Sequence, residues 1–133
     1  MQQQLKTRLK RRLAMAWMAA SLAAPAMVLA HGAKPAQYGG VVQVASDLQF
    51  ELVNRDGTVT LYVDDHDRKL PVAGATGKLT VLTGAQKTET ALAAGAGNAL
   101  VAADRMQLAK GAKAVALVRF ADGKSVTVRF TVR

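Results

Sequence analysis

The feature that most limits how this chain can fold is an alternation of apolar and polar residues, interrupted by residues that favour turns. Residues 48–53 and 125–132 alternate most clearly, with Val126, Val128 and Phe130 on one predicted face of the last segment. A period of two residues indicates a β-strand with one buried face, because successive side chains of a strand point to opposite sides. The pattern therefore predicts strands rather than helices.

Turn signals separate the predicted strands. Asp56-Gly57 and Asp122-Gly123 are the strongest, because Asp and Gly tolerate the positive φ angles of a tight hairpin. The predicted strands cover residues 41–45, 48–53, 58–63, 77–83, 87–92, 99–103, 113–120 and 125–132. Seven or eight short strands at this spacing predict an all-β fold, an antiparallel, Ig-like β-sandwich over residues 41–133. Residues 31–40, which include Pro35, are expected to form a flexible lead-in.

Residues 1–30 have the pattern of a secretory signal peptide, which is expected to be helical. A basic stretch comes first, then the apolar residues 13–24, and Val28-Leu29-Ala30 fits the small-residue rule for cleavage. Cleavage after Ala30 and Sec export to a bacterial periplasm are the prediction. An uncleaved membrane anchor is the alternative, but residues 13–29 are shorter than the ~20 apolar residues that a spanning helix needs. Membrane contact is therefore expected only through an uncleaved signal peptide.

The net charge of +9 overstates how basic the exported part is. Five of the 18 Lys and Arg lie in the signal peptide, at Lys6, Arg8, Lys10, Arg11 and Arg12. The remaining charges are scattered without a basic run, and aromatic residues for base stacking are few, so nucleic-acid binding is not expected. The chain has no cysteine, which excludes disulfides.

Enzymatic activity is not expected either. Ser46 and Ser125 are the only serines after the signal peptide, and neither lies in a Gly-x-Ser-x-Gly turn. Phosphate-binding and dinucleotide-binding glycine patterns do not occur. Paired carboxylates can be drawn from Asp64, Asp65 and Asp67, but so small a domain rarely offers the deep cleft that such chemistry uses.

One polar cluster is a candidate metal site. Asp64, Asp65, His66 and Asp67 place three carboxylates and an imidazole in four residues, a donor set that suits Cu(II) or Zn(II). Cleavage after Ala30 would make His31 the first residue, with a free α-amino group beside its imidazole. His31 and His66 are the only histidines, so together they are predicted to supply nitrogen ligands. The alternatives are a solvated turn at 64–67 and a frayed N-terminus at His31.

Several stretches resemble a known family. They are His31-Gly32, the run YGGVV at 38–42, the run LYVDDH at 61–66, LPV at 70–72 and Gly74-Ala75. They are similar to small periplasmic proteins associated with heavy-metal efflux systems of the RND type, and to N-terminal portions of metal-efflux adaptor subunits. A looser likeness, through His31 alone, is to CopC-type copper carriers. Tyr38 stands where relatives tend to have a histidine.

The resemblance implies a metal-homeostasis accessory protein that serves as a periplasmic efflux-system component. The alternative is an envelope structural or interaction module that binds no metal and docks on a protein partner. The oligomeric state stays open.

Overall fold

The computed structural model describes residues 32–133, so the predicted signal peptide and His31 lie outside the described residues. Nine strands make up the described part: β1 (Val41–Ala45), β2 (Leu48–Arg55), β3 (Thr58–Asp65), β4 (Arg68–Lys69), β5 (Thr76–Thr83), β6 (Gln86–Ala94), β7 (Ala99–Ala102), β8 (Lys113–Arg119) and β9 (Ser125–Thr131). No helix occurs among residues 32–133, and the prediction of an all-β fold is confirmed. A helix able to cross a membrane is accordingly absent from this part of the chain.

All eight predicted strands are present, with bounds that differ from the prediction by at most two residues. The strand that the sequence pattern missed is β4, a two-residue strand that turns back against the end of β3. Arg68-Lys69 is too short and too polar to show an alternating pattern. β4 pairs with β3 because the turn at residues 66–67 reverses the chain.

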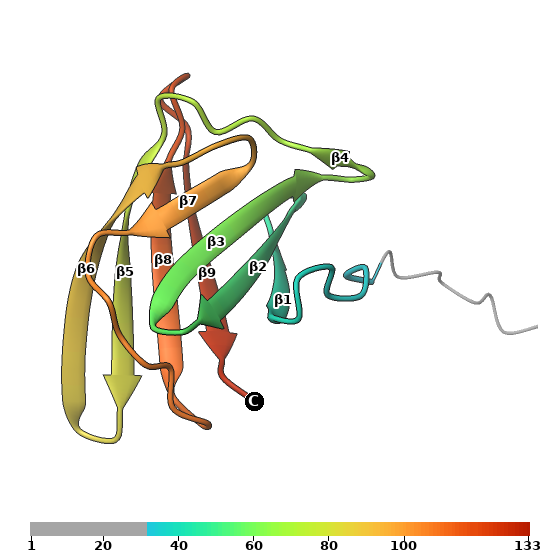
Figure 1. Ribbon diagram of the computed structural model, residues 1–133. Helices are drawn as coiled ribbons and strands as arrows, with labels where there is room; N and C mark the ends of the chain where they lie inside the picture. The colour runs from blue at the N-terminus through green and yellow to red at the C-terminus, as the bar shows by residue number, and fades with distance from the viewer. Residues whose placement is uncertain (1–31) are drawn as a thin grey trace, which may run out of the picture. The chain divides into compact units, whose positions relative to one another are not determined.

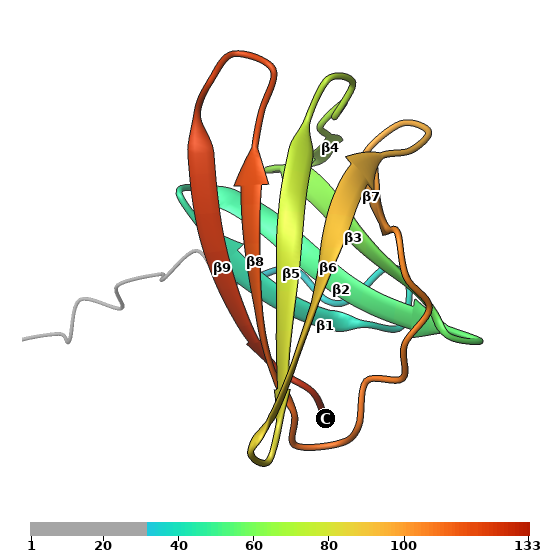
Figure 2. The same ribbon diagram turned by 90° about the vertical axis from the view of Figure 1, so that its left-hand side faces the viewer.

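The strands form one antiparallel sheet in the order β1-β2-β3-β7-β6-β5-β8-β9, with β4 paired to β3 outside this path. In Figure 2, strands β1, β2 and β3 cross behind the layer of β6, β5, β8 and β9, and Figure 1 shows the two layers from the side. An Ig-like sandwich consists of two separate sheets, whereas here β7 pairs with both β3 and β6 and joins the layers. The end strands β1 and β9 approach each other, so the sheet curls into a nearly closed barrel.

The hydrophobic core fills the space between these layers. Its largest fully buried side chains include Phe50, Leu61, Leu79, Leu100 and Val118, contributed by β2, β3, β5, β7 and β8. Each occupies the inward position of an alternating strand, as the period of two predicts. The buried core residues run from Phe50 to Val132 in the sequence, and the described residues 32–133 form one compact unit around this core.

Two hairpin turns use the positive φ angles that the sequence indicated. Asp56 and Gly57 have φ of 53° and 84°, and Gly123 has φ of 89°. The β1–β2 turn is different, because Ser46 and Asp47 take φ of 50° and 62° without a glycine. Non-glycine residues adopt this conformation at some cost, and Asp is among the types that tolerate it best.

Gly77 in β5 provides a test of how closely the strands pack. A Cβ atom at this position would lie 2.6 Å from the carbonyl oxygen of Leu117 and 3.3 Å from the Leu92 side chain. Because the first neighbour is backbone, Gly77→Ala is expected to lower the free energy of unfolding by about 1–3 kcal/mol. Urea denaturation measures this, with Thr76→Ala at the exposed neighbouring position as the control. Equal stability of the two variants would contradict the close approach of the Leu117 backbone to Gly77.

Candidate functional site

The predicted metal cluster lies at the end of the β3–β4 hairpin. Asp64 and Asp65 are the last residues of β3, Asp65 pairs with Arg68 of β4, and His66-Asp67 form the two-residue turn. His66 has a φ of 55°, a conformation in which histidine is more frequent than most residue types. The side chains of His66 and Asp67 are 73% and 85% exposed, so this hairpin tip projects into solvent.

The imidazole of His66 is oriented by its neighbour. Nδ1 of His66 lies 2.7 Å from Oδ1 of Asp65, a contact in which Nδ1–H donates to the carboxylate. A carboxylate that holds one ring nitrogen fixes the tautomer and leaves the other nitrogen, Nε2, with its lone pair available. Metal-binding histidines in proteins are commonly oriented in this way. The geometry therefore gives Asp65 the position of an orienting partner.

Asp64 is turned away from the hairpin tip. It lies on the outer face of β3 and is only 7% exposed. Its Oδ1 accepts a hydrogen bond of 3.0 Å from Nδ2 of Asn98, and its Oδ2 accepts one of 3.1 Å from Nε2 of Gln37. Successive residues of a strand point to opposite sides, which separates Asp64 from Asp65 although they are adjacent in sequence. Asp64 thus holds neighbouring segments together.

Asp67 has a cationic partner. Its carboxylate forms an ion pair with Nζ of Lys34, which comes from the segment before β1. Within the described residues, no three His, Cys, Asp or Glu side chains are grouped so that they could hold a metal ion. Of the predicted ligands, the structure brings only His66 and Asp65 into contact with each other. Asp67 contacts Lys34, and Asp64 contacts Gln37 and Asn98. His31 falls outside the described range.

Residues 34–40, called here the anchored segment, lie along the outer face of β2 and β3. Although the sequence predicts a flexible lead-in, Oε1 of Glu51 accepts hydrogen bonds from the backbone N–H of Tyr38 (2.8 Å) and Gly40 (2.9 Å). Oε2 of Glu51 accepts a third from Gln37, at 2.8 Å. Glu51 is 4% exposed, so these charge-assisted bonds are shielded from water.

Two further contacts extend this anchoring in both directions. The backbone N–H of Lys34 donates a hydrogen bond to Oε1 of Gln49. Gln49 pairs with Asp64 in the β2–β3 ladder, so the start of the anchored segment lies beside the end of β3. The ring of Tyr38 stacks on that of Tyr62, with centroids 3.7 Å apart and planes 12° apart. The anchored segment therefore leads from the outer face of the sheet to the hairpin tip.

Sequence reasoning did not identify Glu51, Gln49 or Asn98 as structural polar residues. Gln49 and Glu51 occupy the polar positions of an alternating strand, which ordinarily face solvent. No local signal distinguishes them from exposed residues, because their burial depends on a segment more than ten residues earlier in the chain. Within the described part of the chain, every buried side-chain polar atom has a partner.

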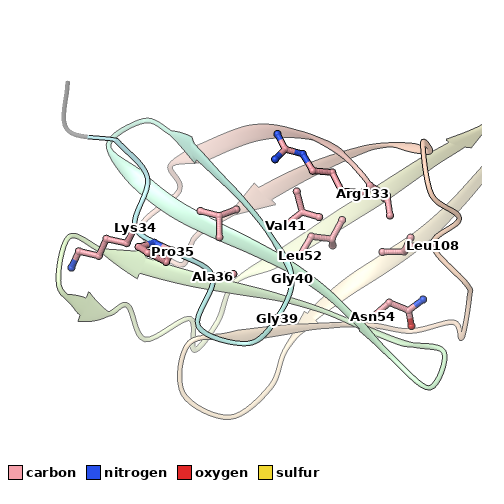
Figure 3. Close-up of a pocket in the computed structure, with 12 residues that line it drawn as sticks. Lys34, Pro35, Ala36, Gly39, Gly40, Val41, Leu52, Asn54, Leu108 and Arg133 are labelled. Carbon is pink, nitrogen blue, oxygen red and sulfur yellow. The ribbon is translucent and has the colours of Figure 1, made fainter. Parts of the chain in front are cut away.

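A hollow of about 450 Å³ is lined by residues of the anchored segment, of β1 and β2, and by Leu108 and the last two residues of the chain (Figure 3). Its lining includes Pro35, Gly40, Val41, Leu108 and Arg133. Figure 3 shows the Lys34 side chain extending to one side, away from Asn54 and Leu108. The described lining contains no carboxylate or imidazole side chain, so the hollow is unsuited to a divalent metal and is distinct from the hairpin tip.

Comparison with known proteins adds no relative. No protein-family model, curated protein or solved structure gives a significant match to this chain. The resemblance to efflux-associated periplasmic proteins therefore stays a prediction.

Proposed function

We propose that this chain is an exported, non-enzymatic protein of the bacterial periplasm that binds a divalent transition metal, Cu(II) in the first place and otherwise Zn(II). In this proposal it serves as an accessory component of a heavy-metal efflux system. The signal-peptide pattern of residues 1–30 supports export, and the resemblance of residues 61–66 and 70–75 to efflux-associated proteins supports the cellular role.

The observation that carries the proposal is the pairing of His66 with Asp65 at the hairpin tip. Because Asp65 accepts the Nδ1 proton, Nε2 of His66 is the nitrogen left for a metal, and the exposed ring makes it accessible. Imidazole nitrogen suits both Cu(II) and Zn(II). The proposed site therefore begins with one oriented nitrogen ligand.

The position of the anchored segment favours His31 as the source of further nitrogen ligands. Lys34 pairs with Asp67 at the hairpin tip, and His31 precedes Lys34 by three residues. A fully extended chain of three residues spans at most about 11 Å, and we propose that His31 reaches the hairpin tip across this short distance. Its ring nitrogen and the α-amino nitrogen produced by cleavage would complete a set of three nitrogens.

Asp67 is the proposed oxygen ligand, and Lys34 is its competitor. The ion pair between them is exposed, and exposed pairs contribute little stability, so a metal ion can displace the ammonium group. Asp65 contributes by orienting His66. Asp64 is left out of the ligand set, since Asn98 and Gln37 already use both of its oxygens.

Titration of Cu(II) and Zn(II) into protein purified after export, with His31 verified as the first residue by intact mass, tests the proposal. We expect a dissociation constant in the micromolar range or tighter. His66→Ala should weaken Cu(II) binding at least about tenfold, and Asp65→Asn should weaken it about tenfold by releasing the imidazole. Electron paramagnetic resonance of the Cu(II) complex should show one nitrogen fewer in His66→Ala.

Asp122→Asn is the matched control, because Asp122 is an exposed carboxylate at the β8–β9 turn. This variant should bind Cu(II) as the unmodified protein does. One extra residue in front of His31 should weaken binding by blocking the α-amino group. A millimolar dissociation constant, or no effect of His66→Ala, would overturn the metal-site proposal.

The alternative function is an envelope interaction module that binds no metal. It is favoured by the ion pair that already occupies Asp67 and by the internal hydrogen bonds that occupy Asp64. Under this alternative, the exported protein would bind neither Cu(II) nor Zn(II), and the hairpin tip would be a surface feature only.

A further inference from the structure

One face of the sheet gathers positive charge. The outward positions of β5, β6, β8 and β9 follow from their ladder register, in which Lys78 is opposite Leu117, Leu82 is opposite Lys113 and Val115 is opposite Arg129. Figure 2 looks onto this layer, and Figure 1 places it on the side of the domain away from the anchored segment. We call it the basic face; its charged residues are Lys78, Lys87, Lys113, Arg119, Arg129 and Glu89.

The basic face contains the whole excess of positive charge in residues 32–133. Five basic residues lie on it against one acidic residue, whereas the other eight basic residues of this part are matched by eight acidic ones. All five basic side chains are exposed. A domain that is nearly neutral elsewhere therefore presents one strongly positive surface.

Only part of this charge is neutralised within the domain. Oε1 of Glu89 lies 3.1 Å from Nζ of Lys87 and 3.5 Å from Nζ of Lys78. The hydrogen bond from Lys87 and, next to it, the charge of Lys78 lower the pKa of the Glu89 carboxyl below its ordinary value. Lys113 donates to the hydroxyl of Thr131, and among the described residues no carboxylate pairs with Lys113, Arg119 or Arg129.

Two leucines are exposed among these cations. Leu82 and Leu117 are 40% and 45% exposed, and both point outward on the basic face. Lys87 and Lys113 lie opposite Leu82 on the two neighbouring strands, and Lys78 lies opposite Leu117. The face thus combines cationic groups with apolar side chains that can enter an interfacial layer.

We propose that the basic face docks on an anionic phospholipid surface. Lys and Arg would contact the headgroup phosphates, while Leu82 and Leu117 would contact the boundary with the acyl chains. None of the outward residues of the four described strands is aromatic, which disfavours stacking on nucleic-acid bases and the aromatic anchors of tight protein interfaces. This contact is independent of the signal peptide and of the metal site.

Co-sedimentation with vesicles tests the proposal, using exported protein in the presence of a metal chelator. The protein is expected to bind vesicles of phosphatidylcholine mixed with phosphatidylglycerol and not vesicles of phosphatidylcholine alone. Binding should weaken as salt is raised, because the contact is electrostatic. The double variant Lys113→Glu, Arg129→Glu should bind at least about tenfold more weakly. Glu89→Gln should bind more tightly, since it removes the one anion of the face.

The matched control is Arg55→Glu, Arg68→Glu, which changes the net charge equally on exposed residues of β2 and β4. It should retain most of the vesicle binding. Equal losses in the two double variants would overturn the proposal, because net charge rather than this face would then control binding. Absence of binding to phosphatidylglycerol vesicles would overturn it too, as would capture by a polyglutamate peptide without vesicle binding. Circular dichroism of each variant verifies that the exposed substitutions leave the fold intact.

Discussion

Replacing Glu51 with alanine is expected to release the anchored segment and to lower the free energy of unfolding by about 2–4 kcal/mol. The carboxylate accepts three backbone hydrogen bonds while almost fully buried, so its loss leaves Gln37, Tyr38 and Gly40 without their acceptor. Hydrogen exchange reports this directly. The amide protons of these three residues should exchange at rates close to those of an unstructured peptide, while those of β5 and β8 keep their protection.

Glu51→Gln distinguishes the charge from the shape of the side chain. An amide has one oxygen and one NH₂ group, so it cannot accept from donors that converge on both oxygens of the carboxylate. We therefore expect a substantial loss in this variant as well. Glu89→Ala, which removes an exposed carboxylate, is the control and should leave the free energy of unfolding nearly unchanged. Unchanged exchange at residues 37–40 in Glu51→Ala would contradict the anchoring role.

Release of the anchored segment also has a consequence for the proposed metal site. Lys34 holds the start of this segment at the hairpin tip, and its N–H donates to Gln49. If His31 is a ligand, Glu51→Ala should weaken Cu(II) binding while leaving the His66–Asp65 pair intact. Weaker exchange protection with unchanged Cu(II) affinity would separate the two roles and remove His31 from the site.

Phe50→Ala is expected to have the largest effect on stability, a loss of about 3–5 kcal/mol. Phe50 has no exposed surface, and it lies in β2 opposite Gln43 of β1 and Val63 of β3. Truncation removes the transfer free energy of the ring and leaves a cavity that the surrounding strands can fill only in part. Small domains have net stabilities of about 5–15 kcal/mol, so this loss is a large fraction of the total.

Guanidinium or thermal denaturation measures the Phe50→Ala effect, with Leu117→Ala as the matched control. Leu117 is 45% exposed on the basic face, so its truncation should cost less than about 1 kcal/mol. Similar decreases in the free energy of unfolding of the two variants would contradict the burial of Phe50 in the core between the layers.

Only part of the candidate site could be predicted from the sequence. The run from Asp64 to Asp67 was recognisable as a cluster of metal-ligand types, and its place at the end of a strand was predicted. The distinct environments of its members were not, because they follow from strand alternation and from remote partners. Asp64 contacts Asn98 and Gln37, whereas Asp65 contacts His66.

The sequence by itself determined the strands, most of their turns and the residues that face the core. These features are local, since a period of two and a positive φ at Asp-Gly depend only on neighbouring residues. Tertiary structure alone decided that β7 joins the layers into one sheet, that Glu51 holds the anchored segment, and that charges scattered along the chain gather on one face. Each of these depends on pairing between segments far apart in sequence, and the register of that pairing is not encoded in any single stretch.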